Sequence, residues 1–250
     1  MKTIWQTCRD CWLLLAASVL LTGPVLSQDL RLVATDWPPY VDTSITRNGV
    51  APALVLAALQ RAGYKVTLFI YDWPRALTAT QAGDFDAITT LWFTEERART
   101  IAFTEPFIMN ELKFMRRVGD QVQANVREDL VGLRVGVVED FAYGAQPYDT
   151  TGIEVISGGS VGENVEKLLA GEVDLILGDG MVLSHEADKL RAAKKVELLP
   201  TVLESRGLRL GVSRKHAEHE QIVADFNAAI TAMKADGTYN NILGQYRISN

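Results

Sequence analysis

Residues 83–107 read Gly-Asp-Phe-Asp-Ala-Ile-Thr-Thr-Leu-Trp-Phe-Thr-Glu-Glu-Arg-Ala-Arg-Thr-Ile-Ala-Phe-Thr-Glu-Pro-Phe, and this stretch says most about the fold and the function. A glycine turn followed by apolar and β-branched residues predicts a short strand over residues 85–90. Thr94 then suits the start of a helix, because its hydroxyl can accept a hydrogen bond from a free N–H of the first turn. Arg97 lies in that turn, where the helix dipole would favour an acid.

Arg97 is therefore a candidate ligand-binding residue. A cation beside a strand end and open N–H donors would suit a carboxylate. Alternatively, Arg97 pairs with Glu95 or Glu96 on a solvated surface, where such a pair contributes little to stability. The local pattern leaves both interpretations open.

Outside this stretch, strand-like and helix-like segments alternate, which predicts an α/β fold with parallel sheet covered by helices. The strand-like segments are residues 30–35, 65–70, 85–90, 133–138, 154–156 and 173–177. The helix-like segments are residues 50–62, 75–81, 160–170 and 180–191. Ser160 and Glu163 fit a capping box at the start of the third helix-like segment.

The alternation breaks at residues 111–117 and 207–214, which are strand-like where a helix would be due. Residues 216–246 then read as helix, apart from a turn at Asp236-Gly237. Two extended crossings, one in the middle of the chain and one near its end, predict two lobes. The chain would pass from the first lobe to the second and return.

Five stretches occur in an order typical of one protein family. They are Thr-Asp-Trp-Pro-Pro-Tyr (35–40), the segment 83–107, Gly-Leu-Arg-Val-Gly-Val-Val (132–138), Gly-Glu-Val-Asp-Leu-Ile-Leu-Gly-Asp (171–179) and Asp-Gly-Thr-Tyr (236–239). Together they resemble the bacterial family 3 extracytoplasmic solute-binding proteins, the amino-acid-type receptors of ABC importers. The resemblance runs from Leu30 to Tyr246.

This resemblance implies the two-lobed periplasmic-binding-protein fold of type II. In that fold each lobe is a mostly parallel sheet flanked by helices, and two crossover strands form the hinge. On this division, residues 28–116 with 213–250 make lobe 1, and residues 117–212 make lobe 2.

Residues 1–27 are predicted to be a signal peptide. Basic residues precede a ten-residue stretch at 12–21 that is apolar except for Ser18, whereas about twenty apolar residues are needed to span a bilayer. Cleavage after Ser27 would leave residues 28–250 in the periplasm. Cys8 and Cys11 would be removed with the leader, so the mature chain is expected to form no disulfide.

The mature chain would carry 23 basic and 30 acidic residues, a net charge of −7. This balance excludes nucleic acid and an anionic lipid surface as partners. His216 and His219 lie three residues apart, but no third ligand has a fitting spacing, so we expect no metal or other cofactor. The protein is expected to be a monomer.

In doubly wound sheets, ligands bind outside the carboxyl ends of the strands. Trp37 and Tyr40 follow the first strand beside two prolines, and they could form an apolar wall of the site or pack in the core. Trp73 follows the second strand, where the resemblance implies stacking on the ligand, although a hydrophobic staple would explain it equally. Thr90 ends the third strand and Trp92 follows it, and both would lie beside the candidate arginine.

The resemblance also implies a role for two charged residues. In family members that bind amino acids, the residue matching Arg97 clamps the ligand's α-carboxylate through its bidentate fork. The residue matching Asp179 accepts the α-ammonium. The alternative for Asp179 is a helix N-cap, since it lies between a strand and a helix.

One segment departs from the family pattern. After residues 133–138, many amino-acid binders have hydroxyl residues and free N–H groups that hold the carboxylate, but here Glu139, Asp140 and Phe141 follow. Two acids would repel a carboxylate. Either they point away and Phe141 lines the site, or the ligand is a cationic amino acid or lies outside the amino-acid class.

The sequence thus predicts a periplasmic receptor that binds an amino acid, or a related carboxylate or amine, between its lobes and delivers it to an inner-membrane ABC permease. No catalytic triad, phosphate loop or mature thiol is present, so a non-enzyme is expected. The alternatives are an enzyme on the same fold, like cyclohexadienyl dehydratases, and a soluble sensor that signals through a separate membrane protein.

Overall fold

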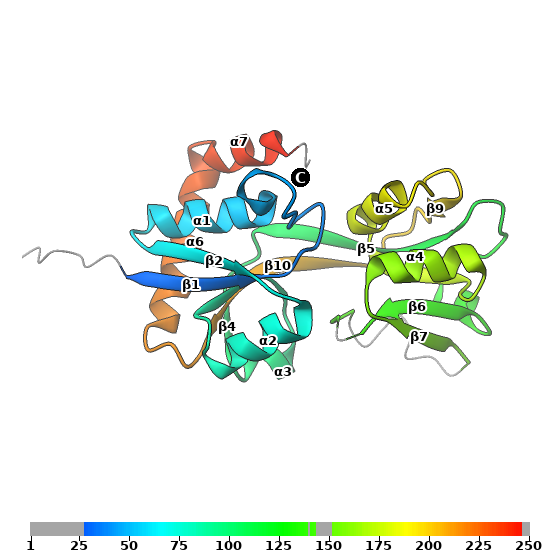
Figure 1. The fold of residues 1–250 in the computed structure, drawn as a ribbon, viewed down its shortest axis with the longest axis horizontal. Coiled ribbons are helices and arrows are strands. Elements are labelled where there is room, and N and C mark those ends of the chain that lie inside the picture. The colour runs from blue at the N-terminus through cyan, green and yellow to red at the C-terminus, as the bar shows by residue number, and fades with distance from the viewer. Residues whose placement is uncertain (1–27, 140, 144–151, 247–250) are drawn as a thin grey trace, which may run out of the picture.

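The computed structural model describes residues 28–139, 141–143 and 152–246. The predicted signal peptide, both cysteines and Asp140 lie outside these residues. Figure 1 shows two bodies joined by two long strands, and we call them the first lobe, which contains β1, and the second lobe, which contains β6.

The first lobe begins with three parallel strands whose carboxyl ends meet at one edge. They are β1 (Asp29–Ala34), β2 (Lys65–Ile70) and β3 (Ala87–Trp92). β1 lies in the middle and pairs in parallel with both neighbours. The helices α1 (Val50–Arg61) and α2 (Trp73–Ala82) connect these strands. The predicted βαβ alternation of this lobe is confirmed.

Two long strands connect the lobes, as the sequence predicts. β5 (Ile108–Arg117) and β10 (Glu204–Ser213) are antiparallel. Residues 108–112 of β5 pair with residues 204–208 of β10. Leu112 stands at the transition, because it pairs with Glu204 of β10 on one side and with Asp179 of β8 (Leu175–Asp179) on the other. A continuous sheet therefore runs through both lobes, in the order β2-β1-β3-β10-β5-β8-β6-β7.

The second lobe repeats the α/β pattern. β6 (Arg134–Val138) pairs in parallel with β7 (Glu154–Gly158) and with β8. The helices α4 (Val161–Ala170) and α5 (Gly180–Lys189) cover this part of the sheet, on one side of β6 in Figure 1.

The chain returns to the first lobe for its last two helices. α6 (His219–Ala235) and α7 (Thr238–Gln245) are separated by a turn at Gly237, which has a φ of 82° and therefore favours glycine. Both helices lie beside α1 in Figure 1.

Three local predictions were incomplete. The short strands β4 (Ile101–Phe103) and β9 (Val196–Leu198) were not predicted, because each is stabilised by pairing with a long strand that is distant in sequence. β3 continues to Trp92, because Leu91 and Trp92 pair with β10.

The capping box is only half formed. Ser160 Oγ accepts a hydrogen bond from the N–H of Glu163 over 3.1 Å, as predicted. The carboxylate of Glu163, however, accepts from the N–H of Gly159 rather than from that of Ser160.

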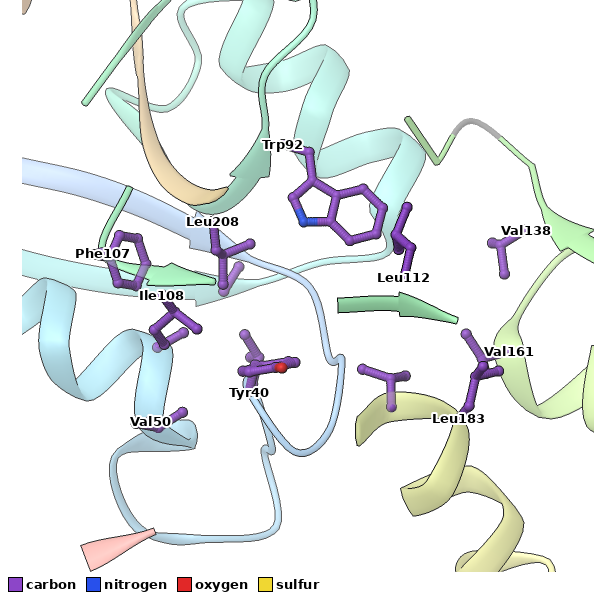
Figure 2. Close-up of a cluster of buried hydrophobic side chains, with 14 of the residues drawn as sticks. Tyr40, Val50, Trp92, Phe107, Ile108, Leu112, Val138, Val161, Leu183 and Leu208 are labelled. Carbon is purple, nitrogen blue, oxygen red and sulfur yellow. The ribbon is translucent and has the colours of Figure 1, made fainter. Parts of the chain in front are cut away.

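The hydrophobic core is shared between the lobes. Figure 2 shows part of it, which reaches from Val50 past Tyr40 and Leu112 to Val138 and Leu183 of the second lobe. Burial of each such side chain contributes about 1.5–3 kcal/mol. Within the described residues, no helix is both long enough and apolar enough to cross a membrane.

Candidate ligand-binding site

The carboxyl ends of β1 and β3 place several predicted residues around one small, half-open cavity. Its volume is about 60 Å³. The residues that line it are Thr35, Asp36, Trp37, Trp73, Thr90, Trp92, Arg97, Phe141, Ala142 and Leu208. Leu208 belongs to the crossing strand β10, and Phe141 and Ala142 follow β6 in the second lobe, so both lobes contribute to the cavity.

Arg97 is held in a fixed position at this cavity. It lies in α3 (Glu95–Ala98), and its backbone N–H donates to the hydroxyl of Thr94 over 3.1 Å, which confirms the predicted N-cap. Its guanidinium donates to the backbone oxygen of Trp92 over 3.0 Å and lies 5.2 Å from the ring centroid of Trp73. With only 7% of its surface exposed, Arg97 is a buried cation rather than a solvated surface residue.

Three buried polar atoms on lining residues have no hydrogen-bond partner among the described residues. They are the hydroxyl of Thr35 and the indole nitrogens of Trp37 and Trp73. Buried polar groups are normally paired, and each unpaired one costs about 1–3 kcal/mol. A ligand with acceptor oxygens is one way to satisfy them.

Phe141 brings an aromatic ring from the second lobe against the tryptophans of the first. Its ring centroid lies 5.6 Å from that of Trp73, 6.3 Å from that of Trp37 and 6.1 Å from that of Trp92. All three pairs have an edge-to-face geometry, which is favourable for aromatic rings. The cavity therefore has largely aromatic walls.

Trp92 is fixed by a residue that the sequence did not single out. Its indole N–H donates to the side-chain oxygen of Asn110 on β5 over 2.8 Å. This bond points the ring toward the crossing strands, so Trp92 both lines the cavity and belongs to the core in Figure 2.

Asp179 lies outside the lining of this cavity. It is the N-cap of α5, where its Oδ1 accepts from the N–H groups of Met181 and Val182, each over 3.0 Å. Its Oδ2 accepts from the hydroxyl of Tyr40 over 3.2 Å, and the residue is 3% exposed. The structure thus shows the capping role, and contact of Asp179 with a ligand stays a prediction.

The environment of this pair shifts both pKa values. Burial raises the pKa of the Asp179 carboxyl, and the N–H of Val182 and the hydroxyl of Tyr40 lower it by a smaller amount. Burial, and then the charge of Asp179, raise the pKa of the Tyr40 phenol. Tyr40 therefore keeps its proton at physiological pH and remains a donor.

A larger cleft of about 530 Å³ adjoins the small cavity. Five residues line both: Thr35, Asp36, Trp37, Trp73 and Phe141. Beyond them the walls of this outer cleft come from the segment after β6 and from helices α4 and α5. Its acidic lining residues are Asp36, Glu139, Glu163, Glu166 and Glu186, and its basic lining residue is Lys189.

The predicted residues thus divide into two groups. Those at the small cavity are Trp37, Trp73, Thr90, Trp92, Arg97 and Phe141, and those that are bonded to each other outside its lining are Tyr40 and Asp179. Their roles toward a ligand stay predictions. Sequence reasoning did not select Thr35, Asp36, Ala142 and Leu208 as site residues, although Thr35 ends a predicted strand and Asp36 directly follows it, so that position could have indicated both.

No group of three or more residues that could hold a metal ion occurs in the described part of the chain. The chemistry of the cavity is instead that of a binding site, with a buried cation, indole donors and aromatic walls.

Comparison with known proteins gives consistent matches. A sequence model of the bacterial extracellular solute-binding proteins, family 3, matches residues 32–248. The L-arginine-binding protein of Pseudomonas aeruginosa is 27% identical over 177 residues, which are 68% of this chain and 68% of that protein. The lysine/arginine/ornithine-binding periplasmic protein of Escherichia coli is 24% identical over 196 residues, 75% of this chain and 74% of that protein.

Among solved structures, an ancestral arginine-binding protein bound to arginine superposes with a TM-score of 0.75 at 23% identity. The match covers 87% of this chain and 97% of that one. At this identity the likeness shows the fold alone, and it confirms the predicted two-lobed architecture.

Proposed function

The chain belongs to the bacterial extracellular solute-binding proteins of family 3, and we propose that it captures a small polar solute, an amino acid or a related carboxylate or amine, in the cleft between its lobes. Matched relatives are binding proteins for L-arginine and for lysine, arginine and ornithine, and not enzymes. We further propose that the solute is passed to an ABC importer in the inner membrane.

One observation carries this proposal: residues of both lobes line a small cavity at the strand ends, with Arg97 buried in its lining. A guanidinium presents two parallel N–H donors, which match the two oxygens of a carboxylate. Solute contact with Trp37 and Trp73 of the first lobe and Phe141 of the second would favour the closed arrangement of the lobes, because only there can one ligand touch all three.

The location of the protein is part of the proposal. Residues 1–27 act as a cleaved leader, and the mature protein begins near Gln28 in the periplasm. N-terminal sequencing of the protein released from the periplasm tests this. Recovery of the chain in membranes with Met1 intact would contradict it.

Direct binding tests the main proposal. Thermal-shift screening of residues 28–250 against amino acids, amines and small carboxylates should give a set of stabilising ligands. A ligand at a hundred times its Kd stabilises a protein by about 2.7 kcal/mol. Uptake of the labelled ligand should fall in cells that lack the gene, and unchanged uptake would contradict delivery to an importer.

A further inference from the structure

We infer that the ligand of this cleft is a carboxylate whose cationic group stands away from the α-carbon, as in an ω-amino or ω-guanidino acid. The inference rests on the proposed function, because it concerns the ligand class of the same site. It differs from the α-amino acid that the family resemblance implies.

Three side chains at the small cavity are hydrogen-bond donors only. The guanidinium of Arg97 and the indole nitrogens of Trp37 and Trp73 can donate but cannot accept. The two indole nitrogens are buried and have no partner among the described residues. These groups favour the acceptor oxygens of a carboxylate and disfavour an ammonium, which is itself only a donor.

An α-ammonium finds no buried carboxylate at this cavity in the described part of the chain. Both oxygens of Asp179 already accept hydrogen bonds, from two backbone N–H groups and from Tyr40, and the residue does not line the cavity. Asp36 does line it, but it is exposed at the mouth, and its Oδ1 accepts from the N–H and the hydroxyl of Thr43. The buried positive charge of Arg97 further disfavours a second cation next to the carboxylate.

The size of the cavity places the rest of a longer ligand in the outer cleft. A volume of about 60 Å³ has room for roughly four to six water-sized groups, which is a carboxylate and a few carbon atoms. The outer cleft shares five lining residues with the cavity, so an extended ligand in the cavity would continue into the outer cleft.

The outer cleft has the opposite electrostatic character. Five acids and one base line it, so it attracts a cation. Glu163 and Glu186 pair with Lys167 and Lys189, at 2.7 Å and 3.3 Å. Glu139 and Glu166 have no such ion pair within the described residues, which leaves their carboxylates available for the distal cation of a ligand.

Constitutional isomers give a direct test, because they differ only in the position of the ammonium group. We would measure by calorimetry the affinity of 4-aminobutyrate against 2-aminobutyrate, and of 6-aminohexanoate against norleucine. Each ω-isomer is expected to bind at least tenfold more tightly than its α-isomer. Lysine and arginine complete the panel, because they carry both an α-ammonium and a distal cation.

Two variants test the origin of the preference. Glu139→Gln and Glu166→Gln should each reduce the preference for the ω-isomer several-fold. The matched control is Glu172→Gln, which removes an exposed acid just beyond α4 that lines neither cavity. This control should leave the ratio of the two affinities unchanged.

The outcomes separate this inference from the proposed function. Equal or tighter binding of the α-isomers, or an ω-preference that Glu139→Gln and Glu166→Gln both leave intact, would overturn the inference and uphold solute binding. If none of the isomers, lysine or arginine bound, the inference would be overturned, whereas the proposed function would be overturned only if the wider thermal-shift screen also gave no ligand.

Discussion

The hydroxyl of Tyr40 donates a hydrogen bond to Oδ2 of Asp179 over 3.2 Å, which joins the loop after β1 in the first lobe to the N-terminus of α5 in the second. Both side chains are buried. The bond therefore links the two lobes through residues that do not line the cavity, and it engages the carboxylate that the family pattern assigns to the ligand.

The substitution Asp179→Asn should change how stability depends on pH. Burial raises the folded-state pKa of this carboxyl, so the folded protein binds the proton more tightly than the unfolded chain. Wild-type stability is therefore lost as pH rises from about 4, the usual value for Asp, through the raised pKa. Asparagine caps helices as well as aspartate does but cannot ionise. The stability of the variant relative to wild type should therefore increase with pH over this range.

Thermal unfolding between about pH 3 and pH 8 measures this difference. Asp174→Asn is the control of opposite sign, because Arg134 lowers the pKa of Asp174. The stability of that variant relative to wild type should decrease as pH rises. A difference for Asp179→Asn that does not vary with pH would contradict the prediction.

Arg97→Ala should abolish ligand binding and keep the fold. Loss of one partner of a desolvated charge pair costs about 2–5 kcal/mol of affinity. Arg97→Lys should also bind poorly, because an ammonium lacks the planar fork. Calorimetry with the identified ligand measures both. Arg75→Ala is the matched control, since Arg75 lies over the Tyr71 ring, with 3.8 Å between guanidinium carbon and ring centroid, and lines neither cavity.

Phe141→Ala should make the ligand-free protein more open. The substitution removes the ring contacts that join the second lobe to Trp37, Trp73 and Trp92, each contributing about 0.5–1.5 kcal/mol. Small-angle scattering should show a larger radius of gyration than for wild type, and ligand should reduce it in both proteins.

The control for this variant is Phe93→Ala, because Phe93 contacts Phe103 within the first lobe. Its radius of gyration should equal that of wild type. A radius of gyration equal to that of wild type for Phe141→Ala as well would show that the aromatic contacts do not hold the lobes together.

Gly207→Ala should destabilise the crossing strand β10. A Cβ atom at this position would lie 2.6 Å from the Cβ of Pro106, and such overpacking costs about 1–3 kcal/mol. Gly244→Ala is a useful contrast, since a Cβ there meets nothing within 4 Å and alanine in a helix gains about 0.5–1 kcal/mol over glycine. In urea unfolding, the midpoint should be lower than that of wild type for Gly207→Ala and higher for Gly244→Ala. Midpoints equal to that of wild type would contradict both predictions.

The positions of Thr94, Arg97 and Trp73 could be predicted, because each depends on the local order of strand, helix cap and helix. A strand followed by a capped turn puts Thr94 and Arg97 at a sheet edge whatever the rest of the chain does. Trp73 follows in the same way from the capped start of α2, where the carboxylate of Asp72 accepts from the N–H of Arg75.

The sequence pattern around Asp179 could not decide between contact with a ligand and a role in the structure alone. Whether Asp179 meets a ligand or Tyr40 depends on how closely the loop after β1 approaches α5, and these segments are 139 residues apart in sequence. The partner of Trp92, Asn110, was likewise hidden, because nothing in the pattern of β5 distinguishes one inward polar residue from another.

The sequence by itself determined the α/β alternation, the two crossing strands and the position of Arg97 at a strand end, because periodicity, capping and chain order are local properties. Only the tertiary structure decided the character of the cleft. Contact between the lobes commits Asp179 to Tyr40, inserts Phe141 among the tryptophans and gathers acids from separate helices around the outer cleft. Burial and charge there are sums over residues distant in sequence, and they become defined only when the chain is folded.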